Sequence, residues 1–310
     1  MLSRRSLLVA PLLATATGAY GVGIEPLLQT NVTRYRVRPA SWPAGLKLKV
    51  AVIADIHACE PWMDIERIGQ IVQLTNRLGA DVIVLLGDYV AGHKKITAIV
   101  PDRDWATTLG GLRAPLGVYA ILGNHDWWAD KTAQLRGRGP IAARLALEKA
   151  GIAVLENENA RLTKDGHEFW IAGLAEQEAL LGYSSGRTVK RGVDDLEATL
   201  AAVPPDAPVI LLVHEPDIFP RVPERVSLTL AGHTHGGQVR VLGSALFAPS
   251  ELSMAYCYGH FFEGERHLIV SGGLGCSWWP VRFGMPPEVV FVEIEGQASR
   301  HHSLERRSAG

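Results

Sequence analysis

Cysteine is scarce in this chain, and a strong net charge is absent. The 310 residues include three cysteines, Cys59, Cys257 and Cys276. An odd and sparse set provides no disulfide framework, although one pair could still form, and without a CxxC motif a thiolate zinc site is not expected. The formal net charge of −1 creates no strong overall field, so specific nucleic-acid binding is not expected either.

The chain also lacks long hydrophobic runs, and the apolar stretch near its N-terminus is short. Arg4 and Arg5 precede an uncharged, mostly apolar stretch over residues 6–19, shorter than the roughly 20 residues of a membrane-spanning helix. A basic start, an apolar stretch and small residues at its end are typical of a signal segment, and the arginine pair resembles a twin-arginine export signal. A general secretory signal, an uncleaved anchor and a disordered start of a cytoplasmic chain are the alternatives.

These features predict two parts of unequal size. Residues 1–25 are expected to be the signal segment or membrane anchor, and residues 26–310 a single folded domain. The expected location is across, or anchored to, the bacterial cytoplasmic membrane, in the periplasm or cell envelope. Hydrophobic residues make up 47% of the chain and charged residues 20%, an ordinary globular composition with enough apolar residues for a large core.

Short apolar runs alternate with helical patterns along the chain. The runs at residues 46–54, 82–86, 117–122, 209–213 and 227–231 predict buried strands. Apolar residues at helical spacing predict helices over residues 65–78, 141–150 and 193–202, whereas residues 183–191 are expected to form a polar, basic loop. Strand and helix alternate early and strands dominate later. This order indicates an α/β fold in which two mixed β-sheets are packed together and flanked by helices, a four-layer sandwich.

A polar cluster follows each of these five apolar runs. The clusters are Asp55-Ile56-His57, Gly87-Asp88, Gly123-Asn124-His125-Asp126, His214-Glu215 and Gly232-His233-Thr234-His235-Gly236-Gly237. Ligands of α/β sheets bind outside the carboxyl ends of strands, so the clusters can converge although they are far apart in the sequence. They supply oxygen and imidazole donors without sulfur, a set that suits Mn, Fe or Zn better than Ca.

The ordered set of clusters resembles the signature of the calcineurin-like metallophosphoesterase superfamily. That signature reads D-x-H, GD, GNH(D/E), H and GHxH, and the resemblance covers residues 47–293. The run from Gly232 to Gln238 and the later motifs around Gly272 and Arg282 resemble an exported or membrane-associated bacterial branch that includes phosphodiesterases. Each block alone has an ordinary structural explanation, such as a turn, a helix cap or a surface histidine. To explain all five blocks in this way, five such features would have to occur by coincidence at the ends of strands.

The resemblance implies a site for two divalent metal ions, Mn, Fe or Zn. The seven implied ligands are Asp55, His57 and His235 for the first metal, Asn124, His214 and His233 for the second, and Asp88 as the bridge between them. A water held by the metals would have its pKa lowered toward neutrality and act as the nucleophile. His125 is expected to act as general acid or to stabilise a phosphate oxygen, and Asp126 to hold the other ring nitrogen of His125.

The substrate is less clearly indicated than the reaction. Tyr89, Trp127 and Trp128 flank the ligand blocks and are expected to line the substrate cleft, with core packing as the alternative. The resemblance implies hydrolysis of a phosphodiester, including lipid-linked or nucleotide-linked ones, by a chain that associates with the membrane. A phosphomonoesterase or nucleotidase on the same metals, a non-catalytic cell-envelope binding protein, and a metal hydrolase of amides or acyl esters are the competing hypotheses.

Overall fold

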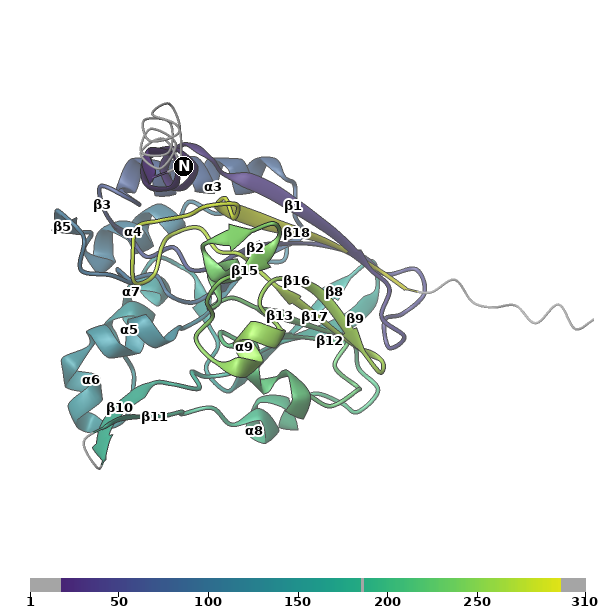
Figure 1. The fold of residues 1–310 in the computed structure, drawn as a ribbon. Helices are drawn as coiled ribbons and strands as arrows, with labels where there is room; N and C mark the ends of the chain where they lie inside the picture. The colour runs from purple at the N-terminus through teal and green to yellow at the C-terminus, as the bar shows by residue number, and fades with distance from the viewer. Residues whose placement is uncertain (1–17, 185–186, 297–310) are drawn as a thin grey trace, which may run out of the picture.

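Two six-stranded sheets stacked face to face form the centre of the fold (Figure 1). The computed structural model describes residues 18–184 and 187–296. In hydrogen-bonded order, the first sheet consists of β1 (Asn31–Val37), β18 (Glu288–Glu295), β2 (Lys47–Ile53), β4 (Val82–Leu86), β6 (Val118–Ile121) and β7 (Ala153–Val154). The strands β2, β4, β6 and β7 are parallel, whereas β18 runs antiparallel to β2, so the sheet is mixed.

The second sheet is mixed in the same way. Its order is β16 (Gly259–Glu263), β17 (Arg266–Val270), β13 (Leu228–Ala231), β12 (Val209–Leu212), β9 (His167–Gly173) and β8 (Glu158–Lys164). The central strands β9, β12, β13 and β17 are parallel, and the two edge strands are antiparallel to their neighbours. Three small strand pairs lie outside the sheets: β3 (Cys59–Glu60) with β5 (Ala98–Ile99), β10 (Leu180–Ser184) with β11 (Arg187–Arg191), and β14 (Arg240–Val241) with β15 (Ser244–Ala245).

Helices cover the outer faces of both sheets. The helices are η1 (Tyr20–Ile24), α2 (Glu25–Leu28), α3 (Ile65–Arg77), α4 (Asp102–Leu109), α5 (Asn124–Ala129), α6 (Lys131–Arg136), α7 (Ala142–Lys149), α8 (Leu196–Ala201), η2 (Pro216–Arg221), η3 (His235–Gly237) and α9 (Glu251–Ala255). The longest, α3, begins where the Asp64 carboxylate accepts a hydrogen bond from the Arg67 backbone N–H, and its apolar stripe faces the first sheet.

Three apolar clusters hold these layers together. One packs the first sheet against α3, α4 and α7, and includes Ile68, Trp105 and Leu147. A second lies between the two sheets, and the third packs the far face of the second sheet against α8 and η2. Because both faces of the central strands are covered, a strand such as β4 is buried at all five positions. The predicted four-layer α/β sandwich is confirmed.

The sequence patterns locate the strands better than the loops. All five predicted buried strands are present, each within one residue of its predicted ends. The helix predicted over residues 193–202 is shorter, because Asp195 caps it by accepting from the Ala198 N–H. The polar loop predicted over residues 183–191 is wrong in part: antiparallel pairing of β10 with β11 gives a two-stranded hairpin, with Tyr183 opposite Thr188.

The predicted signal segment falls mostly outside the described residues, since residues 1–17 are not among them. Residues 18–28 form the short helical turns η1 and α2, which are fastened to the rest of the fold. The buried carboxylate of Glu25 accepts hydrogen bonds from the backbone N–H groups of Gly284 and Met285. No helix within residues 18–184 and 187–296 is long and apolar enough to cross a lipid bilayer.

Candidate metal centre

The predicted metal ligands lie directly beyond the carboxyl ends of five parallel strands. The segments that carry them follow β2, β4 and β6 in the first sheet and β12 and β13 in the second. Parallel neighbours end at the same edge of a sheet, and the two sheets are stacked so that these edges meet. All seven predicted ligands are buried. The fold therefore brings together polar side chains that are up to 180 positions apart in the sequence.

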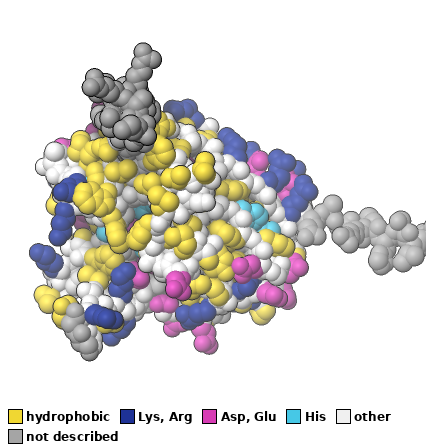
Figure 2. All heavy atoms as spheres, viewed as in Figure 1, with side chains coloured by type: hydrophobic (Ala, Val, Ile, Leu, Met, Phe, Trp, Pro, Cys, Tyr) yellow, Lys and Arg dark blue, Asp and Glu magenta, His cyan; other side chains and the backbone are white. Residues whose placement is uncertain are grey.

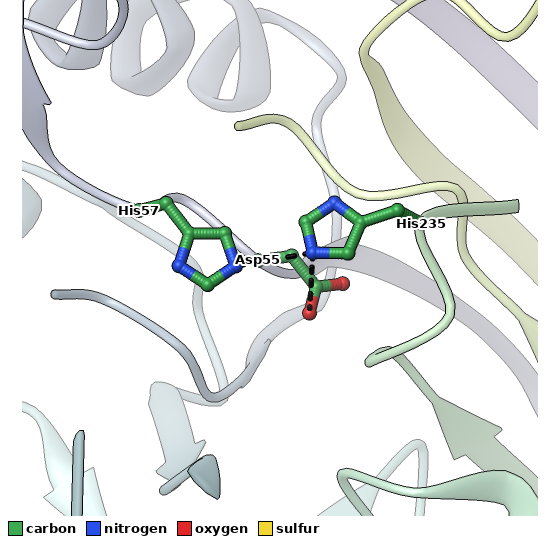
Figure 3. Close-up of side chains that lie close together, drawn as sticks. All are labelled: Asp55, His57 and His235. Atoms are coloured by element: carbon green, nitrogen blue, oxygen red, sulfur yellow. Dashed lines mark hydrogen bonds and ion pairs between the residues drawn. The ribbon is translucent and has the colours of Figure 1, made fainter. Parts of the chain in front are cut away.

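The first group consists of Asp55, His57 and His235, as Figure 3 shows. The Nε2 atoms of His57 and His235 are 3.0 Å apart, and the two rings are nearly parallel. Nε2 of His235 is 3.9 Å from Oδ1 of Asp55. One donor atom from each residue lies within 4.8 Å of the other two, so all three side chains can reach one ion.

The second group is centred on the amide oxygen of Asn124. Oδ1 of Asn124 is 3.1 Å from Nε2 of His214 and 3.2 Å from Nδ1 of His233. Glu215 also has a carboxylate oxygen within 4.8 Å of donor atoms on both histidines. Oε2 of Glu215 accepts a hydrogen bond from Gln177. This group supplies a second set of oxygen and nitrogen donors beside the first.

Asp88 lies between the two groups. Its Oδ2 is 3.5 Å from Nε2 of His57 in the first group and 3.3 Å from Nε2 of His214 in the second. Its Oδ1 accepts a hydrogen bond from the backbone N–H of His125 at 2.9 Å. Burial lowers the pKa of His214, but the Asp88 carboxylate, with smaller contributions from Glu215 and Glu176, more than offsets this effect and raises that pKa well above its usual value. A carboxylate in this position can contact ions in both groups.

Backbone carbonyls orient two of the histidines. Nδ1 of His57 is 2.8 Å from the Val90 carbonyl oxygen, and Nδ1 of His214 is 2.7 Å from the Leu86 carbonyl oxygen. A ring that donates its Nδ1–H to a carbonyl presents the Nε2 lone pair to the site, as a metal ligand must. Burial lowers the pKa of His57 to about 3, so this ring is neutral at pH 7. The orientation and the sulfur-free donor set fit two divalent metal ions.

The backbone at the site adopts conformations that few residues with side chains tolerate. Five of the seven predicted ligands have positive φ angles between 48° and 68°: Asp55, His57, Asp88, His233 and His235. Such residues cost about 1–3 kcal/mol each and persist where the surrounding structure fixes them, as happens at functional sites. Gly123 is required by a close approach, because a Cβ there would lie 2.2 Å from Oδ1 of Asp88.

The prediction that Asp126 orients His125 is wrong. The Asp126 carboxylate is buried and accepts hydrogen bonds from four backbone N–H groups, those of Asp88, Tyr89, Val90 and Gly123. We call this arrangement the Asp126 clasp. It joins the loop after β4 to the loop after β6, so the hydrogen bonds of the Asp126 carboxylate hold the backbone of the site and go to backbone N–H groups, not to the ring of His125.

Two of the three predicted cleft residues lie elsewhere. Tyr89 is buried, stacks on Trp105 and donates its hydroxyl to the Ile121 carbonyl. Trp127 lines a separate cavity of about 500 Å³ with Arg138 and Glu156. Residues three apart on a helix share a face, so α5 directs Trp128 to the side of His125 and Trp127 away from it. The ring centroids of His125 and Trp128 are 5.1 Å apart.

A cavity of about 630 Å³ opens over the two ligand groups. His125 lines it together with Asp88, Asn124, His233 and His235, and Trp128 forms part of its wall. Nε2 of His125 is 3.4 Å from the Ser277 hydroxyl. Ser277 and Lys190 line the cavity too. No sequence pattern pointed to Ser277, and Lys190 was expected in the polar, basic loop over residues 183–191.

A buried arginine behind the first group was also missed. Arg282 is fully buried, and Nη2 lies 3.2 Å from Nδ1 of His235 while donating to the carbonyls of Gly272 and Gly275. Burial and the neighbouring His57 and Arg282 lower the pKa of His235 well below its usual value. The guanidinium therefore fixes the loop from Gly272 to Gly275 against this ligand.

Metal binding should stabilise the fold measurably, because it relieves repulsion between buried carboxylates. Burial and, less strongly, the Asp88 carboxylate raise the pKa of Asp55 to about 7, although His214 opposes this. A ligand at about 100 times its Kd stabilises by about 2.7 kcal/mol, which for a chain of 310 residues raises Tm by roughly 4 °C. The measurement is Tm of chelator-treated protein with and without Mn²⁺. Calcium is the matched control and should shift Tm less, because it prefers sites made of oxygen ligands. Equal shifts with Mn²⁺ and Ca²⁺ would contradict the inference that these nitrogen and oxygen donors prefer Mn²⁺.

Comparisons with known proteins agree with this geometry. Residues 48–237 match the sequence model of the calcineurin-like phosphoesterase family. The chain is 30% identical over 280 residues to an uncharacterized metallophosphoesterase of Aquifex aeolicus (strain VF5), covering 87% of this chain and 93% of that protein. It is 28% identical over 310 residues to phosphodiesterase YaeI of Escherichia coli (strain K12), covering 95% of this chain and 100% of that protein.

A third relative is longer than this chain. It is the bovine (Bos taurus) transmembrane protein with metallophosphoesterase domain, to which the chain is 30% identical over 270 residues. The match covers 82% of this chain and 54% of the bovine protein. The family match extends over more than half of the chain and includes every predicted ligand. The chain therefore belongs to the calcineurin-like phosphoesterase family.

Proposed function

We propose that this chain hydrolyses a phosphodiester at a site that holds two divalent metal ions. Membership of the family implies a phosphoester hydrolase. The observation that carries the proposal is the position of Asp88 between two donor groups at the inner end of the cavity that His125 lines. This arrangement provides two cation positions and a proton-carrying ring beside them, which hydrolysis of a phosphate ester requires.

The residues of the chain have separate tasks in this scheme. Asp55, His57 and His235 would hold one ion, and the group around Asn124 the other, with Asp88 in contact with both. Bound there, two divalent ions polarise the phosphoryl oxygens and lower the pKa of water at the site. The ring of His125 would hold a proton at Nε2 and donate it, or a hydrogen bond, to the oxygen of the departing group.

The cavity favours a diester over a monoester. Among the described residues that line it, Lys190 is the one lysine or arginine, and its ammonium group is paired with Glu178. A monoester dianion needs more positive charge beyond the metals than a diester monoanion does. The apolar walls leave room for a second ester group, and a relative similar along the whole chain is named phosphodiesterase YaeI.

We also propose that the domain acts at the cell envelope. The support is the basic and apolar sequence of residues 1–25, together with the bovine relative that is named a transmembrane protein. In this proposal residues 1–25 are the signal segment or anchor and the remainder is a single catalytic domain. Fractionation of cells that express the tagged full chain would test it, and recovery of the chain in the cytoplasm alone would contradict it.

A comparison of two chromogenic esters tests the reaction. With Mn²⁺ bound, the purified full chain should hydrolyse bis(4-nitrophenyl) phosphate with a kcat/KM at least tenfold above that for 4-nitrophenyl phosphate. His125→Ala should lower kcat for the diester roughly 10²–10³-fold, the usual size of a general acid–base contribution, while both metals stay bound. The matched control is His167→Ala, a partly exposed histidine on β9 that does not line the cavity.

Each alternative function predicts a different result in these assays. A preference for the monoester would favour a phosphomonoesterase or nucleotidase on the same metals. No turnover of either ester by protein with two bound metals would favour a binding protein. An unchanged kcat in His125→Ala would show that this ring takes no part in catalysis, and the assignment of the metal ligands would still stand.

A further inference from the structure

The cavity over the metal ligands has an apolar mouth. The ligands at its inner end are buried, whereas four of the large hydrophobic side chains that line it are between 48% and 63% exposed. These four are Leu246, Phe247, Trp278 and Trp279. Val239 and Val281 add to the apolar lining of the cavity. The site is therefore reached along hydrophobic side chains, an unusual approach for a substrate that is only a hydrated anion.

Two segments that are distant in the sequence build this mouth together. The rings of Phe247, which follows β15, and Trp278, which precedes β18, have centroids 4.7 Å apart. Leu242, in the turn between β14 and β15, is also fully exposed. Figure 2 shows hydrophobic side chains gathered on the face of the molecule where Figure 1 places β15. Contiguous exposed apolar patches on soluble domains usually mark a place of interaction.

A cationic side chain lies at the apolar mouth, since Nζ of Lys95 lies 5.4 Å from the centroid of the Trp279 ring. Lys190, whose Nζ lies 5.0 Å from the centroid of the Trp128 ring, is paired with Glu178. Among the described residues that line the cavity, Asp88 at its inner end is the one carboxylate. The rim thus combines apolar surface with positive charge, which complements a hydrocarbon chain joined to an anionic phosphate.

The chain enters the fold beside the same mouth. The backbone N–H of Arg282 donates to the Gly21 carbonyl at 2.8 Å, and the ring of Tyr20 packs edge-on against Phe283. Glu25 is tied to Gly284 and Met285 of the same loop. Residues 6–17, which precede this point, contain no charged residue. An apolar leading segment attached here would keep the mouth near any bilayer that holds it.

We propose that the substrate is an amphiphilic phosphodiester, a lipid whose phosphate reaches the metal ligands while its hydrocarbon chain lies against Phe247 and Trp278. The inference rests on the proposed function and names the substrate class for that site. In the reaction a water oxygen bonds to phosphorus and the bond from phosphorus to one ester oxygen breaks. The departing alcohol takes up a proton, and the other ester bond is retained.

A homologous series of substrates tests the hydrocarbon contact. The 4-nitrophenyl diesters of methyl, butyl and octyl phosphate share a leaving group and differ only in the alkyl chain. Assayed below their micelle-forming concentrations with the full chain and Mn²⁺, they should show kcat/KM rising at least tenfold from methyl to octyl, because burial of each methylene is favourable. Phe247→Ala and Trp278→Ala should each reduce the octyl-to-methyl ratio at least threefold.

The control is another exposed hydrophobic residue. Leu135→Ala changes an exposed leucine of α6 that does not line the cavity, and it should leave the ratio unchanged. A ratio near one with normal turnover of the methyl ester would overturn the lipid inference and leave the proposed function standing. An equal loss of ratio in Leu135→Ala would overturn it too. No turnover of any ester by protein with two bound metals would overturn the proposed function itself.

Discussion

Asp88→Asn is expected to lower kcat for phosphodiester hydrolysis roughly a thousandfold, which corresponds to about 4 kcal/mol of transition-state stabilisation. Asp88 lies between the two donor groups, with contacts of 3.5 Å to His57 and 3.3 Å to His214. Asparagine keeps the shape but removes the negative charge that lies between two cation positions. It also tolerates the positive φ of 57° at this position, so the backbone should keep its conformation.

The measurement combines metal content with turnover. We expect Asp88→Asn to bind fewer than two Mn²⁺ ions per chain at concentrations that fill both positions in the unmodified protein. Asp206→Asn, on an exposed turn after α8, is the matched control and should leave both quantities unchanged. If Asp88→Asn kept two ions and turned over within tenfold of the unmodified chain, Asp88 would not be the bridge.

The convergence of the ligands was predictable because it follows from the strands. Continuous apolar runs identify buried strands, and parallel strands end at a common edge, so the polar residues after β2, β4 and β6 had to meet. The same reasoning places His214 and His233 together beyond β12 and β13. What the sequence could not show is the positive φ at Asp55 or His57, because the hydrogen bonds of this backbone, such as that from the His57 N–H to the Asp88 carbonyl, go to a loop that is distant in the sequence.

The two wrong cleft assignments, Tyr89 and Trp127, have one physical origin: each side chain points away from the cavity. Tyr89 follows Asp88 directly and faces the opposite side, into the core against Trp105. Residues 124–129 were not recognised as helical in the sequence; on a helix, Trp128 shares a face with His125 while Trp127 does not. Proximity in sequence to a ligand was therefore a poor guide to the cleft.

The walls of the cavity were beyond prediction for a different reason. They come from the β10–β11 hairpin, the segment after β15 and the loop before β18, three regions that have no common pattern. Phe247 and Trp278 touch only because β14–β15 and that loop fold onto each other: the Arg240 N–H donates to the Phe283 carbonyl at 2.8 Å. Trp278 and Trp279 are adjacent in the sequence, but nothing in the sequence links them to Phe247.

Asp126→Ala is expected to lower the free energy of unfolding by about 4 kcal/mol, a large effect for one residue. The substitution leaves four backbone N–H groups of the Asp126 clasp without an acceptor, and each buried donor without a partner costs about 1–3 kcal/mol, less where water enters. Because one of these groups belongs to Asp88, the affinity for Mn²⁺ should also fall, by roughly 10–100-fold. Asp126→Asn keeps one acceptor oxygen and should lose about half as much stability.

Urea unfolding of the metal-free variants separates this structural role from a catalytic one. Asp130→Ala is the matched control, since the Asp130 carboxylate also accepts from two backbone N–H groups, those of Ala133 and Ala142, but is partly exposed. It should cost about 1 kcal/mol, as helix caps do. If Asp126→Ala unfolded like the unmodified chain while kcat and its pH profile changed, Asp126 would act on His125 after all. If it unfolds far more easily than Asp130→Ala, the carboxylate supports the two loops that carry Asp88 and Asn124, and the site depends on it through the backbone alone.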